Sequence, residues 1–172
     1  MSSHWPTYEE WFASLAHADQ DRARELTRLF RSLGTEDAES WARSEISENI
    51  PQLARFLVLN IIRKHALDYW RLTGVLDEVA KENKTVERLI KHLRQSGFRD
   101  TEIELFAQRI AAITAWQIVH TLDEGCDVDA TERLPGWSLG EIDADGNGTG
   151  RNIGGLHESF YEFDPTRVGD DR

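Results

Sequence analysis

The stretch from Ile50 to Leu72 holds the richest apolar run of the chain, and it constrains the fold more than any other feature. In a helix its apolar side chains point in every direction around the axis, and a helix that is apolar all round must be surrounded by other elements. Pro51 suits the first turn, and Gly74 suits the left-handed position after the end. The sequence therefore predicts a central helix over 50–72. Its apolar residues are Leu53, Phe56, Leu57, Val58, Leu59, Ile61 and Ile62.

A second long helix is predicted over 101–124, where Thr101 and Glu104 match a capping box. A wide stripe of mostly apolar side chains then follows helical spacing up to Gly125. We expect this stripe to face the core and to pack directly on the 50–72 helix. The stripe consists of Ile103, Phe106, Ala107, Ile110, Ile113, Thr114, Gln117 and Ile118.

Local start and stop signals predict shorter helices elsewhere in the first 125 residues. Thr7 and Glu10 form a capping-box pattern ahead of the first helix. Gly97, with Phe98 able to pack back on Leu93, fits a Schellman end for a helix over 85–96. Such signals depend only on residues a few positions apart.

The composition changes after Cys126. Eight of the 12 glycines lie in 126–172, helical periodicity disappears, and apolar residues flank Asp145 and Gly146 as in two strands joined by a turn. We expect a mainly α fold, a multi-helix bundle around the central apolar helix with a C-terminal glycine-rich hairpin or extended arm. The expected divisions are a bundle over 1–125, an acidic glycine-rich arm over 126–163 packed on the bundle or on a partner, and a frayed tail over 164–172.

The chain is acidic, since 20 Lys and Arg against 31 Asp and Glu give a formal charge of -11. Residues 126–172 hold 11 acidic and 4 basic side chains, so they carry −7 of that charge. Such a balance repels phosphates and anionic lipids, and we expect neither nucleic acid nor a membrane as partner. Segments 85–96 and 101–124 also have the outline of a helix-turn-helix, but Glu102 and Glu104 would then face phosphate.

The single cysteine, Cys126, excludes an intrachain disulfide and fits a reducing compartment. No apolar run approaches the roughly 18 residues that span a bilayer, and the N-terminus lacks the pattern of a signal peptide. The sequence therefore predicts a cytoplasmic protein.

Asp143, Asp145, Asn147 and Gly148 match positions one, three, five and six of an EF-hand calcium loop. The rest of the pattern fails, because Arg151 stands at position nine and a glycine stands where a bidentate glutamate belongs. Asp, Asn and Gly are also ordinary turn formers, so a turn is favoured over a metal site. We expect no cofactor.

The histidines include no HExxH pair and no Glu-x-x-His motif, and the glycines match neither a Walker loop nor a dinucleotide fingerprint. His65 on the central helix and His120 on the second long helix can meet between the two helices and, with Asp68, line a polar ligand pocket. A histidine beside a helical core is more often a packing residue. No catalytic signature is present, and whether the chain is an enzyme stays open with a leaning against it.

Two classes of function remain. The favoured one is a non-enzymatic helical protein that acts through protein–protein interaction, as an adaptor, inhibitor or assembly component, with another protein or with itself as a homodimer. The alternative is a small helical-bundle enzyme, or a ligand- or metal-binding protein, with a polar site between the 50–72 and 101–124 helices. The acidic arm is the expected interface, since it presents many apolar groups. These are Trp137, Leu139, Ile142, Ile153, Phe160, Tyr161 and Phe163.

Overall fold

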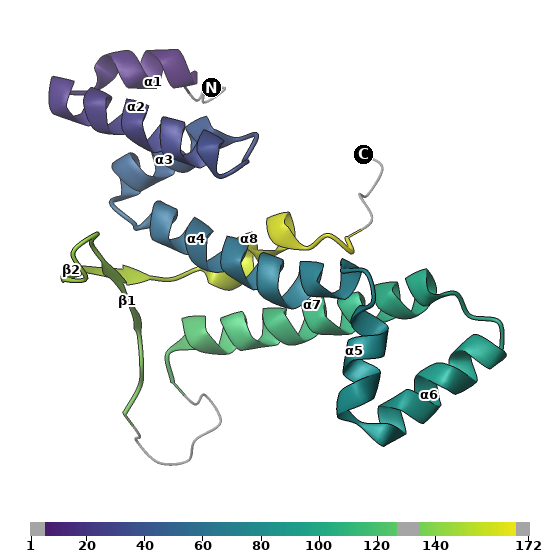
Figure 1. The fold of residues 1–172 in the computed structure, drawn as a ribbon. Coiled ribbons are helices and arrows are strands. Elements are labelled where there is room, and N and C mark those ends of the chain that lie inside the picture. The colour runs from purple at the N-terminus through teal and green to yellow at the C-terminus, as the bar shows by residue number, and fades with distance from the viewer. Residues whose placement is uncertain (1–5, 127–134, 168–172) are drawn as a thin grey trace, which may run out of the picture. The chain divides into compact units, whose positions relative to one another are not determined.

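The computed structural model describes residues 6–126 and 135–167, which form a mainly helical fold with one two-stranded antiparallel sheet (Figure 1). The predicted fold class is therefore confirmed. The chain divides into two compact units, Met1–Leu57 with Ser138–Gly154, and Val58–Trp137 with Gly155–Arg172. Each unit joins residues of the first 125 to residues of the C-terminal segment. The domain boundaries expected from the sequence stay a prediction.

Unit 1 is built around an aromatic cluster. Phe30, Trp41 and Phe56 are buried, and their ring centroids lie 5.3 to 5.8 Å apart. Thr7 caps the first helix in a capping box with Glu10, as predicted. The helices of unit 1 are α1 (Tyr8–Ser14), α2 (His17–Ser32), α3 (Ala38–Glu48) and the first half of α4 (Gln52–Ile62).

The hairpin of unit 1 consists of β1 (Leu139–Ile142) and β2 (Gly148–Ile153), with Leu139 paired to Ile153. The predicted turn at Asp145 and Gly146 joins the two strands, and Gly146 has a φ of 86°, which glycine adopts without a steric cost. The expected hairpin is thus confirmed for residues 139–153.

Unit 2 begins in the middle of α4. The predicted helix over 50–72 is helical without a gap from Gln52 to Arg71, but its type changes, since α4 ends at Ile62 and is followed directly by a π-helical turn, η1 (Arg63–Leu67), and a 3₁₀ turn, η2 (Asp68–Arg71). The predicted packing on the second long helix is confirmed for these turns, since Gln108 Nε2 donates to the carbonyl oxygen of Leu67 at 3.1 Å. The remaining helices are α5 (Val75–Glu82), α6 (Lys84–Gln95), α7 (Asp100–Glu124) and α8 (Leu156–Phe163).

Helix α6 ends in the predicted Schellman motif. Gly97 has a φ of 93°, and the backbone N–H of Phe98 donates to Leu93 at 3.1 Å. Helix α7 begins earlier than predicted, at Asp100, where Glu102 accepts from the N–H of Arg99 at 2.9 Å. The expected Thr101–Glu104 cap is therefore wrong by two residues.

Helix α8 was not expected from the sequence, which predicts an acidic glycine-rich arm over 126–163. Leu156, Phe160 and Phe163 follow i, i+4, i+7 spacing and are buried in unit 2. Two glycines precede this helix, and they masked its short periodic signal in the sequence. The expected frayed tail lies partly outside the described residues, while Asp164 is buried and bonds to Arg109 at 3.0 Å.

Within the described residues, no helix combines the length and the apolar content needed to cross a membrane.

Candidate functional site

Helix α7 buries the side of its surface that carries small and polar residues. Gln108, Ala112, Ala115 and Val119 are buried, at successive spacings of four, three and four. Alanines at two of these positions let neighbouring backbones approach closely. The core face of α7 is therefore set by side-chain size.

The opposite side of α7 exposes large apolar side chains. Phe106 is 68% exposed, Ile110 49%, Ile113 47% and Ile118 55%. We call these four residues the α7 outer face. The expectation that they belong to the core is wrong, because α7 has two apolar stripes with the same helical period and only one of them packs inward.

Ionised side chains are nearly absent from the central part of α7. Between Glu104 and Asp123 the one residue of this kind is Arg109. Its guanidinium donates to Asp164 Oδ2 at 3.0 Å and to Thr166 Oγ1 at 3.3 Å. The outer face therefore lies on a stretch of helix whose one formal charge is already paired.

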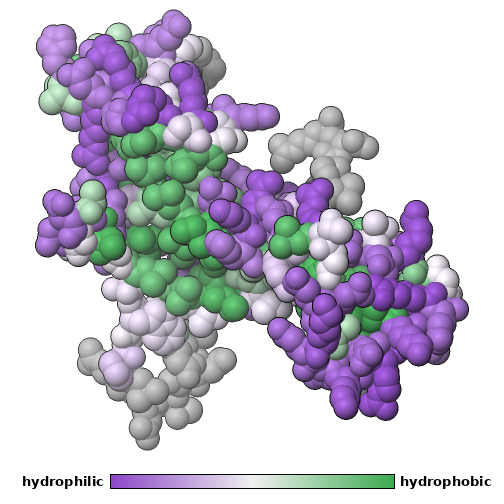
Figure 2. Space-filling view, viewed as in Figure 1, coloured by the Kyte–Doolittle hydropathy of each residue, from purple (hydrophilic) through white to green (hydrophobic). Residues whose placement is uncertain are grey.

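An open groove of about 590 Å³ runs along this helix, and its lining is mainly apolar. On the face seen in Figure 2, hydrophobic side chains gather over α7. One wall of the groove comes from η1 and η2 and the other from α7. The lining residues are His65, Ala66, Tyr69, Trp70, Phe106, Ala107, Ile110, Ala111, Thr114, Ala115 and Ile118.

The three residues expected to form a polar pocket lie in different surroundings. His65 lines the groove. Asp68 forms an ion pair with Arg63 at 3.4 Å. His120 stacks on Trp116, with ring centroids 5.0 Å apart. Their joint role in ligand binding stays a prediction.

His120 belongs to a polar cluster between α7 and α8 that the sequence did not indicate. His157 Nδ1 and the backbone nitrogen of His157 each lie 2.7 Å from Asp123 Oδ2, and the centroids of the two histidine rings are 5.0 Å apart. Asp123 Oδ1 and Trp116 Nε1 are buried without a hydrogen-bond partner among the described residues. A carboxylate that orients an imidazole is a part of many acid–base sites. The pairing joins residues 34 positions apart, so no local sequence signal reveals it.

The calcium-loop candidates form a hydrogen-bonded turn. Asp143 Oδ1 accepts from the backbone N–H groups of Asp145 at 3.0 Å and Asn147 at 2.8 Å. The Asn147 N–H is the main cause that holds the pKa of the Asp143 carboxyl below its ordinary value. In the part of the chain that the structure describes, no group of three His, Cys, Asp or Glu is placed to hold a metal ion.

Arg151, at position nine of that loop pattern, belongs to a charged cluster inside unit 1. It contacts Glu141 at 2.6 Å and Glu45 at 3.3 Å. The Glu45 side chain is only 3% exposed, and it also accepts from the N–H of Leu53 at 2.8 Å and pairs with Arg22 at 3.3 Å. This cluster ties the hairpin to α2, α3 and α4, which is a structural role.

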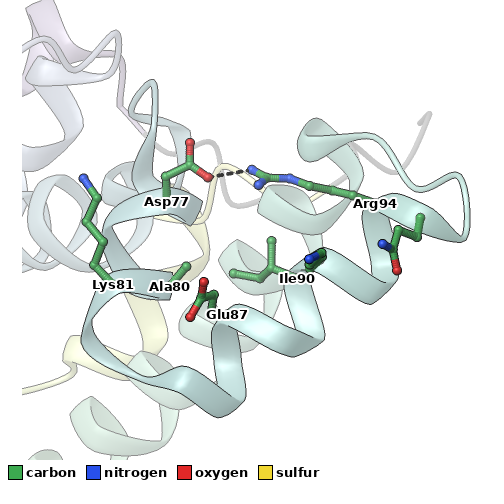
Figure 3. A pocket seen from close by; sticks show the side chains of 8 residues that line it. Asp77, Ala80, Lys81, Glu87, Ile90 and Arg94 are labelled. Carbon is green, nitrogen blue, oxygen red and sulfur yellow. Dashed lines mark ion pairs between the residues drawn. The ribbon is translucent and has the colours of Figure 1, made fainter.

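Helices α5 and α6 line an open, charged cleft of about 640 Å³. Figure 3 shows Asp77 reaching across to Arg94, and their charged groups lie 2.9 Å apart. Arg94 also bonds to Asp100 at 2.8 and 2.9 Å, and these two carboxylates raise the pKa of its guanidinium. Two carboxylates therefore already neutralise the charge of this arginine.

The residues expected to form an interface on the C-terminal segment have mixed exposure. Phe160 and Phe163 are buried in unit 2, where they contribute to its own core. Trp137, Ile142 and Tyr161 are exposed, and Leu139 and Ile153 are half-buried.

Comparisons with known proteins give no match to the chain, whether with protein-family models, curated proteins or solved structures.

Proposed function

We propose that the chain is a non-enzymatic helical protein that acts through protein–protein interaction, and that the α7 outer face is its docking surface. The observation that carries the proposal is the exposure of Phe106, Ile110, Ile113 and Ile118 on one side of a single helix. Contiguous apolar patches of this kind on a folded protein mark interaction sites.

The energetics support this assignment. Full burial of a large apolar side chain contributes about 1.5 to 3 kcal/mol, so covering the exposed half of each of these four contributes about 1 kcal/mol. The near absence of ionised groups on this stretch matters as much, because charged side chains are depleted at the centre of protein interfaces. The four exposed apolar side chains and the lack of ionised groups around them have the character of the centre of a small protein interface.

The proposal extends to compartment and partner class. The exposed thiol of Cys126 is compatible with a reducing cytoplasm. An acidic chain with an apolar docking face suits a protein partner better than a nucleic acid or an anionic membrane.

The test is partner capture from a lysate of the native host with three tagged proteins. Ile110→Glu places a charge on the outer face, while Leu89→Glu places the same charge at a residue of similar exposure, 55%, on α6. We expect the wild type and the Leu89→Glu control to retain the same protein, and Ile110→Glu to lose it. Equal recovery by all three would contradict the proposal.

A second candidate is a ligand-binding role for the groove. It is supported by an apolar lining that includes two aromatic side chains, Tyr69 and Trp70, and one imidazole, that of His65. Soaking with a library of small apolar molecules, followed by thermal melting, tests it. A ligand that raises the melting temperature of the wild type and of His120→Ala, but not of His65→Ala, would support this role.

A further inference from the structure

We propose that a second copy of this chain occupies the α7 outer face, with the two α7 helices packed antiparallel across a two-fold axis. This inference rests on the proposed function and names the partner.

The spacing on α7 supports a helix partner. Three residues of the α7 outer face, Phe106, Ile110 and Ile113, and the exposed Gln117 beyond them follow one another at intervals of four, three and four, and we call these four the seam. This is the a/d spacing of a coiled-coil seam, in which each side chain inserts between side chains of a facing helix. A narrow seam with this period fits another helix better than it fits a strand or a loop.

The same seam is complementary to itself. In an isologous interface residue i meets residue j, and j meets i. An antiparallel pair centred between Ala111 and Ala112 places Ile110 level with Ile113 of the second copy, and Phe106 level with Gln117. Every seam position then finds an uncharged counterpart.

Charge also favours this arrangement. Two copies that each carry -11 repel one another over most of their surfaces. Helix α7 itself brings no carboxylate into the seam, because its acidic residues Glu104 and Asp123 lie beyond the two ends, and its Arg109 is held by Asp164. The α7 outer face is therefore a place where two such chains can meet without juxtaposing like charges.

The size of the seam sets the strength that we expect. From Phe106 to Gln117 the helix rises by about 17 Å, which is short for a stable interface of about 800 Å² per partner. Ile118, 55% exposed on the same helix, widens it. We expect a dimer that dissociates on dilution through the micromolar range.

The experiment is sedimentation equilibrium on the full chain between about 1 and 200 μM. The wild type should approach twice its 19.7 kDa mass at the highest concentration. Ile110→Glu and Ile113→Lys should each stay monomeric with unchanged helical circular dichroism, while Leu89→Glu should dimerise like the wild type. An equimolar mixture of Ile110→Glu and Ile113→Lys should regain the doubled mass, because the antiparallel register sets the two new charges opposite one another.

A wild type that stays monomeric at 200 μM overturns the inference without the help of any variant, and so does a mixture that shows no recovery although both variants are folded. If the monomer still captures another protein through this face, the proposed function stands and only the second copy is wrong. If the wild type dimerises and Ile110→Glu dimerises equally, the face itself is wrong.

Discussion

Glu45 shows how one buried charge organises its surroundings. Its carboxylate receives Arg22, Arg151 and the backbone N–H of Leu53, so its burial is compensated by three donors. Removing Glu45 would leave the backbone N–H of Leu53 without its acceptor and Arg151 paired with Glu141 alone, and an unsatisfied buried donor costs about 1 to 3 kcal/mol.

We therefore expect Glu45→Ala to lower the free energy of unfolding of unit 1 by about 1 to 3 kcal/mol. The matched control is Glu39→Ala, which removes the exposed pair with Arg31 and should cost at most about 1 kcal/mol. Urea denaturation of the two variants measures both losses of stability. Equal midpoints would show that the Glu45 cluster contributes no more than a surface pair.

Glu141 gives the stability of unit 1 a pH dependence. Burial opposes ionisation of Glu141, but hydrogen bonds from Arg151 and Thr149 outweigh it, so the pKa of the carboxyl lies below its ordinary value of 4.5. A lowered pKa in the folded state means that the stabilisation is complete above about pH 4.5 and is lost as the pH falls through the folded value. Thermal melting from pH 7 to pH 3 should show a steeper loss for the wild type than for Glu141→Gln. Parallel curves would contradict this.

The turn at Asp143 is not expected to bind calcium. Its carboxylate is already occupied by backbone donors, and Arg151 stands where a calcium ligand is needed. We expect no calcium binding tighter than about millimolar. Calorimetric titration would overturn this by a micromolar transition that disappears in the Asp143→Ala, Asp145→Ala double variant.

At the scale of the element, α7 shows that the spacing of apolar residues predicts a helix but does not predict which side of it faces the core. The sequence predicts the helix and its apolar stripe, but the period alone does not say which stripe faces inward. Small residues decide it here, since Ala112 and Ala115 allow close packing that Phe106 and Ile113 do not. The local end signals at α1 and α6 are confirmed, while the capping box predicted for α7 is displaced by two residues.

This orientation can be tested by placing a carboxylate on each side of α7. Val119→Asp puts an unpaired charge at a fully buried position and should unfold unit 2, since the cost is comparable to a total stability of about 5 to 15 kcal/mol. Ile113→Asp, on the outer face, should leave the melting temperature within a few degrees. If both variants unfold, the α7 outer face is part of the core and the orientation assigned to α7 is wrong.

Helix α8 was missed because its eight residues follow a glycine-rich segment, and because its packing is visible only in three dimensions. Phe160 is 1% exposed, so Phe160→Ala should cost about 3 to 5 kcal/mol. Tyr161→Ala, at an exposed neighbour, is the control and should cost much less. Chemical denaturation followed by circular dichroism measures the stability of both variants. Equal stabilities would show that α8 does not contribute to the core.

At the scale of the whole molecule, the sequence predicts the fold class, and the interface that it suggests on the C-terminal segment stays a prediction. An acidic segment with scattered aromatics suggested an interface at residues 126–163, yet Phe160 and Phe163 pack inside unit 2. The Asp123–His157 pair and the two-unit organisation depend on contacts between distant residues, which periodicity cannot report.

The most direct test is a dilution series of the wild type observed through isoleucine methyl resonances. We expect the resonances of Ile110 and Ile113 to shift with concentration between about 10 and 500 μM, and that of the buried Ile90 to stay constant. Ile142, on the hairpin and 67% exposed, distinguishes the α7 outer face from the C-terminal segment. Shifts at Ile142 without shifts at Ile110 and Ile113, or no concentration dependence at any of them, would contradict the account.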